Sequence, residues 1–273
     1  MPELPEIETI CRGLKPHLEG RRILTVNIME PRLRCVVDPR LRDRLQGKTI
    51  VRIGRRAKYI LISLSGDVVW IYHLGMSGKL VHVDRRAPRQ KHDHIVASLD
   101  SGHELRYHDP RRFGLSVVVA ESELHKLPQL KRLGLDPFDS RFTGQYLYSF
   151  TRLSDRRIRD LLLDQQIVAG IGNIYANEVL CRVGVRPTTR SRRLTRSQVQ
   201  EIAATIPLVL NEAIRWCGTS FSDYRDAEDK FGEFQNHLRV YDRHGKTCRQ
   251  CPSAIKRIAI GNRSAFYCPS CQR

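Results

Sequence analysis

The apolar residues near the start of the chain recur at intervals of three and four, which is the spacing of one helix face. They are Ile7, Ile10, Cys11, Leu14 and Leu18. We therefore predict an amphipathic helix over residues 5–18. From about residue 22 the apolar repeat shortens to two, which is typical of half-buried strands. These strand-like runs are Ile23–Ile28, Thr49–Ile53, Tyr59–Leu64, Val68–Tyr72, Ile95–Leu99 and Leu115–Ala120.

The second half of the chain returns to a helical repeat. Residues 127–143 are interrupted by proline and glycine and predict a linker. Beyond it, the apolar spacing over residues 158–167 predicts one helix, and Asn173 at a cap position begins another. Thr195 and Gln198 have the spacing of a capping box that starts a long helix. Because strands and helices are segregated along the chain, we predict the α+β class in two lobes.

Four of the eight cysteines lie in the last 26 residues, in two pairs separated by 16 residues. Two Cys-x-x-Cys pairs at this separation place four thiolates around one Zn²⁺ ion. The alternative, two disulfides, requires an oxidising compartment. We therefore predict a C-terminal ribbon held by one structural zinc ion, with the ligands Cys248, Cys251, Cys268 and Cys271. The remaining thiols are predicted to be small buried residues: Cys11, Cys35, Cys181 and Cys217.

The net charge of the chain limits the kinds of molecule that it is expected to bind. Lys plus Arg exceeds Asp plus Glu by 47 − 29 = 18, which gives a net charge of +18. This excess favours a polyanion such as nucleic acid, although a solubility role is the simpler alternative. The sequence shows no apolar run of membrane-spanning length, no basic amphipathic helix and no signal peptide. We therefore expect a soluble intracellular protein with no membrane partner.

The first residues offer a candidate nucleophile. Removal of Met1 leaves Pro2 with a secondary amine, part of which is neutral at cellular pH. Attack by such an amine on an aldehyde-level carbon gives an iminium, and the neighbouring Glu3 can donate and accept protons. The simpler alternative is that the acidic residues Glu3, Glu6 and Glu8 only stabilise a helix N-terminus, and composition alone favours it.

Six blocks of sequence and the cysteine ribbon occur in an order that resembles a known family. The blocks are Pro2-Glu3-Leu4-Pro5-Glu6-Ile7-Glu8-Thr9, Arg55-Arg56-Ala57-Lys58-Tyr59, His73-Leu74-Gly75-Met76-Ser77-Gly78, Lys91-His92-Asp93-His94, Asp109-Pro110-Arg111-Arg112-Phe113-Gly114 and Gly172-Asn173-Ile174-Tyr175-Ala176. Along its whole length the chain resembles the formamidopyrimidine-DNA glycosylases, bacterial enzymes that repair oxidised purines. The endonuclease VIII family is a weaker match, because it typically starts Pro-Glu-Gly and usually lacks the His-Leu-Gly-Met-Ser-Gly block.

The resemblance implies a fold and a set of domains. We expect a catalytic domain at 1–130, built from an N-terminal helix and a β-sandwich, and a linker at 131–145. A DNA-binding domain with a helix–two-turn–helix element is expected at 146–237 and a zinc finger at 238–273. The implied partner is duplex DNA that contains oxidised bases or abasic sites. A monomer in the bacterial cytoplasm, acting on nucleoid DNA, is expected.

The resemblance also implies the catalytic residues of a bifunctional glycosylase and AP lyase. In this family the damaged nucleotide is flipped out of the duplex. Pro2 would then attack C1′ and displace the base, and Glu3 would manage the proton transfers. Lys58 would donate a proton and contact phosphate; its alternative is an ordinary surface lysine. Arg263 would assist the second step of a β,δ-elimination.

Further residues are implied to bind DNA. Met76 and Phe113 would fill the space left by the flipped nucleotide and Arg111 would bond the unpaired base; the alternative for both apolar residues is a place in the core. His92 would contact phosphate, whereas His94 is expected to be a packing residue. Asn173, at a helix start that favours anions, would contact the backbone beside the lesion.

Three departures from the family pattern leave details open. Ser154 stands where a lysine is frequent, so Ser154, Arg156 or Arg157 would contact phosphate. Asn262 and Ala265 replace frequent Gly and Thr near Arg263. The expected lesion-capping loop, at about residues 219–235, keeps Lys230, Gly232, Phe234 and Gln235 but carries Asp229-Lys230-Phe231-Gly232-Glu233 where Gly-Lys-Pro-Gly-Tyr is usual.

Two other functions compete with excision of oxidised purines. One is an endonuclease VIII-like preference for oxidised pyrimidines. The other is a non-catalytic zinc protein that binds damaged DNA. The joint presence of Pro2, Glu3 and Lys58 favours an enzyme, because a binding protein has little reason to keep all three.

Overall fold

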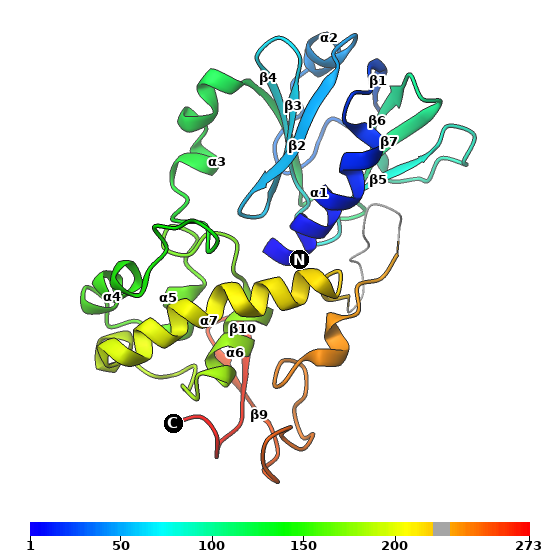
Figure 1. Cartoon of the computed structure of the whole chain (residues 1–273). Coiled ribbons are helices and arrows are strands. Elements are labelled where there is room, and N and C mark those ends of the chain that lie inside the picture. The colour runs from blue at the N-terminus through cyan, green and yellow to red at the C-terminus, as the bar shows by residue number, and fades with distance from the viewer. Residues whose placement is uncertain (221–229) are drawn as a thin grey trace. The chain divides into compact units, whose positions relative to one another are not determined.

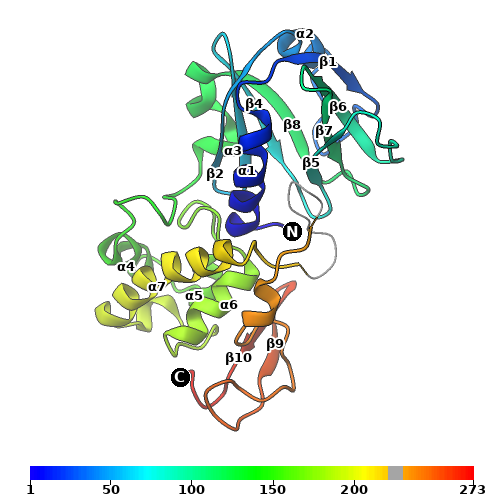
Figure 2. The same cartoon turned by 45° about the vertical axis from the view of Figure 1, so that its right-hand side comes forward.

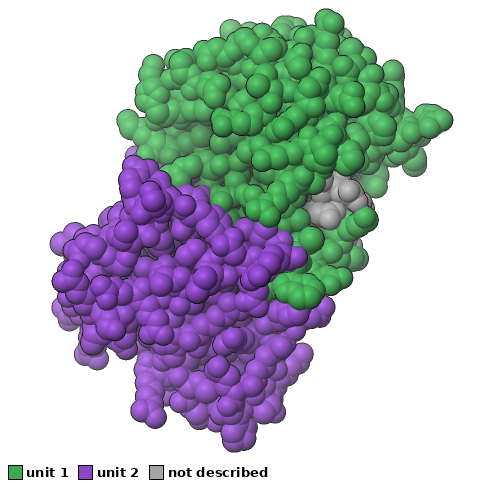
Figure 3. Space-filling view, in the orientation of Figure 1, with its two compact units in different colours: residues 1–131, 216–235 green, residues 132–215, 236–273 purple. Residues whose placement is uncertain are grey.

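The computed structural model describes residues 1–220 and 230–273. Contacts group the chain into two compact units, which Figure 3 shows in different colours. Unit 1 comprises residues 1–131 and 216–235, and unit 2 comprises residues 132–215 and 236–273. Among the described residues, no helix is long and apolar enough to cross a membrane.

Unit 1 begins with the helix that the apolar spacing predicted. Helix α1 (Leu4–Leu18) buries Ile7, Ile10, Leu14 and Leu18, so the prediction of residues 5–18 is confirmed. The helix packs against strand β2 (Ile50–Arg56), as Figures 1 and 2 show. A short helix, α2 (Leu41–Leu45), follows the first strand.

Two four-stranded antiparallel sheets complete the first part of unit 1. Their orders are β1-β6-β7-β5 and β2-β3-β4-β8. Apolar side chains of both sheets and of α1 share one core, which confirms the α+β class. The remaining strands are β1 (Ile23–Ile28), β3 (Tyr59–Leu64), β4 (Val68–His73), β5 (Lys79–Asp84), β6 (Asp93–Leu99), β7 (His103–His108) and β8 (Leu115–Ala120).

Two of these strands, β5 and β7, were not predicted from the sequence. In β7 the charged residues Glu104 and Arg106 are buried and paired with each other. The strand does alternate, but only Leu105 and Tyr107 carry the apolar pattern, which is too short a signal to stand out in the sequence. In β5 most side chains are only partly buried, which weakens the same signal.

Unit 2 contains the α-helices α4 to α7, of which α5 is short, and a hairpin. The predicted helix over residues 158–167 is wrong in length, because the helix ends at Leu162 and residues 164–168 form turns. Asn173 is the first helical residue and Gly172, not Asn173, is the cap. The elements are α4 (Gly144–Arg152), α5 (Ile158–Leu162), α6 (Asn173–Arg182), α7 (Arg196–Arg215), β9 (Lys256–Ile260) and β10 (Arg263–Tyr267).

The capping box of α7 is present as predicted. The Thr195 backbone N–H donates to Gln198 Oε1 at 3.0 Å, and the Gln198 backbone N–H donates to Thr195 Oγ1 at 3.2 Å. The apolar face of this helix is buried along its length. Short segments of helix connect the larger elements: η1 (Glu121–Lys126), α3 (Pro128–Lys131), η2 (Ser191–Arg193) and η3 (Phe234–His237).

Residues 216–235 belong to unit 1, although they follow α7 in the sequence. The expected helical domain at 146–237 included them. Their place in unit 1 has a physical cause, since the Thr219 backbone N–H donates to the buried Glu6 carboxylate at 2.8 Å. A contact between residues so distant in sequence leaves no local signal in the chain.

Two of the four isolated cysteines differ from the prediction. Cys11 and Cys181 are buried, as expected, but Cys35 and Cys217 are exposed. Cys217 has a positive φ of 55° in the turn that follows α7, so its position is set by the turn and not by burial of the thiol. The prediction that all four are buried is therefore wrong for these two.

Candidate active site and nucleic-acid interface

The residues at the N-terminus lie in a buried setting. Pro2 is buried, and Glu3, with 3% of its surface exposed, is the N-cap of α1. The Glu3 backbone N–H donates to Glu6 Oε2 at 2.8 Å, which is one half of a capping box. Stabilisation of the helix N-terminus, the simpler alternative considered above, is thus a real property of these residues. It holds Pro2 and Glu3 in a fixed place and is compatible with catalysis.

Glu6 connects the N-terminus to a distant segment of unit 1. Its second oxygen, Oε1, accepts from the backbone N–H of Thr219. A side chain at Gly218 would come within 2.9 Å of the Glu6 carboxylate, so only glycine allows this close approach. Sequence analysis gave Glu6 only a general role in stabilising the helix N-terminus, although its spacing of three from Glu3 was a visible sign of a capping box.

Lys58 is a buried residue in the tight turn between β2 and β3. Only 6% of its surface is exposed, which rules out the alternative of an ordinary surface lysine. The preceding Ala57 has a positive φ of 53°. Burial, together with the positive charges of Lys58 and Arg34, lowers the pKa of His73 to about 4. The imidazole beside Lys58 is therefore neutral at cellular pH, and its Nδ1 accepts from the Gly75 backbone N–H at 3.1 Å.

Acid should destabilise this protein through two such histidines. Burial, with the charges of its stacking partners His103 and His17, also lowers the pKa of His82 to about 4. Because both imidazoles protonate more readily in the unfolded chain, their contribution to stability is present above pH 6.5 and is lost as the pH falls towards 4. For His73, a pKa about 2.5 below its usual value corresponds to about 3 kcal/mol. Calorimetry between pH 7 and 4.5 should show a falling Tm, with a shallower slope in His73→Gln; an unchanged slope would contradict this account.

Met76 and Phe113 lie on adjacent loops at the surface of unit 1. Their exposed fractions are 43% and 46%, so the alternative of core residues does not hold. A side chain at Gly75, which has a φ of 64°, would come within 2.6 Å of the Phe113 backbone, so the two loops touch. The Arg111 guanidinium lies 4.6 Å from the centre of the Phe113 ring. These contacts place three residues expected to bind DNA in one cluster.

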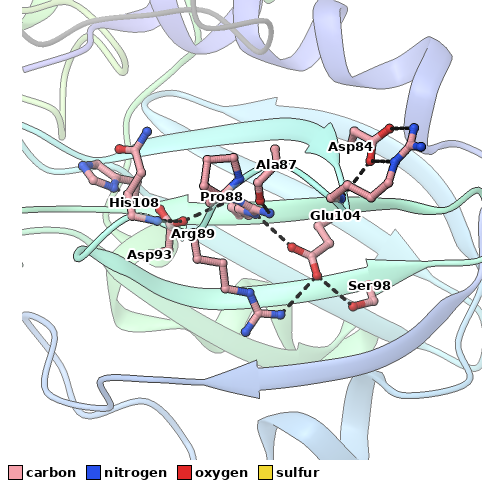
Figure 4. Close-up of polar contacts among 11 residues, drawn as sticks. Asp84, Ala87, Pro88, Arg89, Asp93, Ser98, Glu104 and His108 are labelled. Carbon is pink, nitrogen blue, oxygen red and sulfur yellow. Dashed lines mark hydrogen bonds and ion pairs between the residues drawn. The ribbon is translucent and has the colours of Figure 1, made fainter.

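His92 lies on a loop that a buried ionic network holds down. Figure 4 shows the polar contacts of this network around Glu104, Asp93 and the loop residues Ala87 and Pro88. Arg106 donates from Nε to Glu104 at 2.9 Å and from its two terminal nitrogens to the carbonyls of Pro88 and Ala87 at 2.9 and 2.7 Å. Asp93 accepts from the Gln90 backbone N–H at 2.9 Å. Sequence analysis missed this network, which fixes both ends of the loop that carries His92.

In unit 2, Asn173 faces the zinc-finger hairpin. Its Nδ2 donates to the Ser264 carbonyl at 2.9 Å. One turn later, the buried Asn177 accepts from the Phe266 backbone N–H at 2.8 Å. The next residue, Glu178, is also buried, and its carboxylate accepts from three consecutive backbone N–H groups, those of residues 239–241, each at 2.9 Å. Helix α6 and the finger are therefore joined by polar contacts.

Arg263 stands at the tip of that hairpin. Strands β9 and β10 pair from Arg263–Ile260 inwards, so Gly261 and Asn262 form a two-residue loop. Gly261 has a φ of 57°, which suits glycine at the first position of such a turn. Arg263 is exposed, whereas Phe266 behind it is buried. The departure at Asn262 thus occupies a loop position that keeps Arg263 pointing away from the core of the finger.

Ser154 lies in the loop between α4 and α5. Its hydroxyl accepts from both the backbone N–H and Nε of Arg156, at 3.2 and 3.1 Å. Arg156 also pairs with Asp164 at 2.9 Å. Arg157 is the N-cap residue of α5. Ser154 therefore orients Arg156, and both remain candidates for the phosphate contact together with Arg157.

The four C-terminal cysteines have the geometry of a metal site. Their sulfur atoms lie within 4.8 Å of one another. The closest approaches are 3.5 Å, 3.5 Å and 4.0 Å. Four sulfurs at about 2.3 Å from a tetrahedral zinc ion stand about 3.8 Å apart, so Cys248, Cys251, Cys268 and Cys271 fit one structural zinc ion without rearrangement.

Loss of zinc should unfold the finger and leave the helices. Replacing Cys248 or Cys271 by Ser removes a ligand, and metal coordination is the main source of folding energy in a ribbon of this size. Metal analysis should find about one zinc per wild-type chain and much less in either variant. Circular dichroism should change little, because helices α4 to α7 lie outside the finger. Cys35→Ser, an exposed thiol far away in sequence, is the control; zinc-free wild type would overturn the assignment.

The site residues fall into two groups. Unit 1 contains Pro2, Glu3, Lys58, Met76, His92, Arg111 and Phe113, and unit 2 contains Ser154, Asn173, Arg263 and the four cysteines. Part of the expected lesion-capping loop, residues 221–229, lies outside the described residues. On either side of it, Ser220 and Gln235 are linked, since the Ser220 backbone N–H donates to Gln235 Oε1 at 3.0 Å.

Comparison with known proteins covers both units. The model of the formamidopyrimidine-DNA glycosylase N-terminal domain matches residues 1–116, and that of the formamidopyrimidine-DNA glycosylase H2TH domain matches residues 133–225. A model of the zinc finger found in FPG and IleRS matches residues 245–273.

Whole proteins match over their full length. The formamidopyrimidine-DNA glycosylases of Thioalkalivibrio sulfidiphilus and Hahella chejuensis are 46% and 45% identical to this chain, with 100% of each chain covered. A Lactococcus lactis Fpg structure with abasic-site DNA has a TM-score of 0.92 at 33% identity, with 99% of each chain covered. A second, with Fapy-dG DNA, has a TM-score of 0.93 at 33% identity and full coverage. Because these alignments leave almost no residue of either protein unmatched, the chain belongs to the formamidopyrimidine-DNA glycosylase family.

Proposed function

We propose that this protein uses Pro2, Glu3 and Lys58 to excise oxidised purines from duplex DNA. As a member of its family, the protein is a DNA glycosylase of base excision repair with AP lyase activity. The observation that carries the assignment of residues is the buried N-terminus, where Pro2 and the N-cap residue Glu3 are fixed by Glu6. The substrates are 8-oxoguanine and formamidopyrimidines in DNA.

The chemistry begins once Met1 is removed. The Pro2 nitrogen attacks C1′ of the flipped nucleotide, the bond from C1′ to the base breaks, and Glu3 protonates the sugar as its ring opens. The product is an iminium between Pro2 and C1′. This cation withdraws electrons, so loss of a proton from C2′ expels the 3′ phosphate, and a second elimination expels the 5′ phosphate. Water then releases Pro2.

DNA is held by residues of both units in this proposal. Met76 and Phe113, exposed on adjacent loops, enter the duplex where the damaged nucleotide has left it, and Arg111 bonds the partner base. His92 and Asn173 contact phosphates, as does one of Ser154, Arg156 and Arg157. Arg263 at the finger tip assists the second elimination. The exposed fractions of Met76 and Phe113 support this, because a core residue would not present so much apolar surface.

Oxidised pyrimidines are a second class of candidate substrate. A Lactococcus lactis Fpg structure, 33% identical to this chain, holds DNA containing an oxidized pyrimidine. The altered sequence at the lesion-capping loop, Asp229 to Glu233, stands where the preference between bases is expected to be set. We further propose that the protein acts as a monomer in the bacterial cytoplasm, on nucleoid DNA, and that its domains follow the boundaries predicted above except for residues 216–235.

A substrate panel tests the proposed function. Duplexes containing 8-oxoguanine, a formamidopyrimidine, an oxidised pyrimidine or an abasic site are incubated with the protein and borohydride at one salt concentration, since phosphate binding by a protein of net charge +18 depends on salt. We expect covalent trapping on all four duplexes and, among the three that carry a damaged base, fastest trapping on the oxidised purines. Trapping that is fastest on the oxidised pyrimidine would favour the second substrate class, and binding without trapping would identify a non-catalytic protein.

A further inference from the structure

Asp109 is the buried meeting point of three loops in unit 1. None of its surface is exposed. One carboxylate oxygen accepts from Ser77 Oγ at 2.7 Å, and the other accepts from the Tyr107 hydroxyl and the Gly114 backbone N–H, both at 2.9 Å. The backbone of the same residue donates to the His92 carbonyl at 3.1 Å and accepts from His94 Nε2 at 2.8 Å.

The groups that meet at Asp109 come from the loops that carry the exposed residues. Ser77 follows Met76 directly, and Gly114 follows Phe113 directly. The backbone contacts tie the same residue to His92 on the third loop and to His94 in strand β6, directly after that loop. A single side chain therefore fixes the neighbours of both apolar residues, although it touches neither of them.

The chemistry of this point suits a carboxylate and nothing else of the same size. All three groups that face the side chain are donors, and an ionised carboxylate accepts without donating. Burial and the negative charge of Asp109 raise the pKa of the Tyr107 hydroxyl well above its usual range, so this group remains a donor. An amide at position 109 could place its NH₂ group only against a hydroxyl that turns to accept it, and its uncharged bonds would be weaker than those of the carboxylate.

The surrounding glycines show that the loops are packed too closely to move independently. A side chain at Gly114 would collide with the Tyr107 hydroxyl and the His73 carbonyl, and one at Gly78 would come within 3.0 Å of the same Tyr107 hydroxyl. Both glycines have ordinary backbone angles, so close packing and not turn geometry requires them. Displacing one loop would thus disturb its neighbours.

We propose that Asp109 is a positioning residue that holds Met76 and Phe113 ready to enter the duplex. The inference rests on the proposed role of these two residues in extruding the damaged nucleotide. A loop that is already ordered does not lose conformational freedom when DNA binds, so extrusion is faster. Asp109 touches neither the reacting carbon nor Pro2, and it acts only through the loops that it joins.

The first test compares two substrates. In Asp109→Asn, single-turnover excision of 8-oxoguanine should fall on the order of tenfold, the effect of losing a hydrogen bond to a buried charge. Cleavage at a preformed abasic site, where no base has to be extruded, should change far less. Tyr107→Phe and Ser77→Ala each remove one hydroxyl donor and should shift the ratio in the same direction, which keeps the test decisive if Asp109→Asn does not fold.

A matched control is available in the same unit. The Asp67 carboxylate also joins two segments, since it accepts from the Ser122 backbone N–H and hydroxyl, but it lies outside the three loops. Asp67→Asn should leave both rates unchanged. Equal slowing on both substrates in Asp109→Asn and in both hydroxyl variants would show that the network only supports the fold, and it would overturn the proposal.

Hydrogen exchange separates this proposal from the proposed function. Ser77→Ala should accelerate amide exchange at residues 111–114, on the other side of Asp109, and leave exchange in β2 and β3 unchanged. If exchange at these residues is not accelerated, the inference that Asp109 fixes the loops is wrong. Met76→Ala and Phe113→Ala test the extrusion role separately. If exchange is accelerated in Ser77→Ala but these two variants slow both substrates equally, Asp109 does fix the loops and the proposed extrusion role is wrong.

Discussion

A chain with one extra residue before Pro2 should lose covalent trapping on 8-oxoguanine DNA, by on the order of a thousandfold or more. The reason is chemical: an amide nitrogen has no available electron pair, so it cannot form the iminium. Pro2 is buried at the start of α1, and the change is confined to that end of the chain. Borohydride trapping under single-turnover conditions measures the effect.

DNA binding is the control for this experiment. The residues proposed to contact phosphate lie elsewhere in the chain, so affinity for an abasic-site duplex should change only a few-fold at constant salt. A protein that traps normally with a blocked N-terminus would show that Pro2 is not the nucleophile. Lys58, a buried amine in the same unit, would then be the group to test.

Replacing Glu3 by Gln should separate base excision from the later chemistry. Loss of a general acid slows the step that needs it by roughly a hundredfold to ten thousandfold. Attack on C1′ of an intact nucleotide needs that proton, whereas an abasic site is already an aldehyde. We therefore expect excision of 8-oxoguanine to be almost lost, while trapping on a preformed abasic site continues.

Thermal unfolding provides the control for the Glu3 variant. The Glu6 side chain bonds the Glu3 backbone N–H, a contact that Gln at position 3 retains, so the Tm should change little. A large fall in Tm together with equal losses on both substrates would show that Glu3 acts only as a helix cap. The Asp155→Asn variant, in which an exposed carboxylate near Arg192 is neutralised, should have no effect on the ratio of the two rates.

Some features of the structure followed from local pattern. The apolar spacing of α1, the capping box of α7 and the cysteine spacing each depend on residues that are close in sequence, and each is confirmed. The fold class, the family and the zinc site could be predicted for the same reason, because each is recognised from short motifs whose residues are close in sequence.

The features that the sequence did not reveal depend on contacts between distant residues. Strand β7 was missed because only Leu105 and Tyr107 carry its apolar alternation, and the burial of the Arg106–Glu104 pair on the other face has no sign in the sequence. Glu178 was missed because its partners lie about sixty residues later. The helix after Ile158 was predicted too long because Ile167 continues the apolar spacing after the helix has ended. Each of these features depends on the three-dimensional structure and not on the local sequence.

The bond between Glu6 and Thr219 has a consequence for the order in which the protein is made. Its two residues are 213 positions apart. At 5 to 20 residues per second, the ribosome adds the second roughly ten to forty seconds after the first. During that time the Glu6 carboxylate, which accepts from the Glu3 backbone N–H, lacks its bond to Thr219. Pro2, the proposed nucleophile, is thus among the first residues to be synthesised and among the last to reach its final surroundings, so a chain that terminates before Thr219 carries the amine without the bond between Glu6 and Thr219.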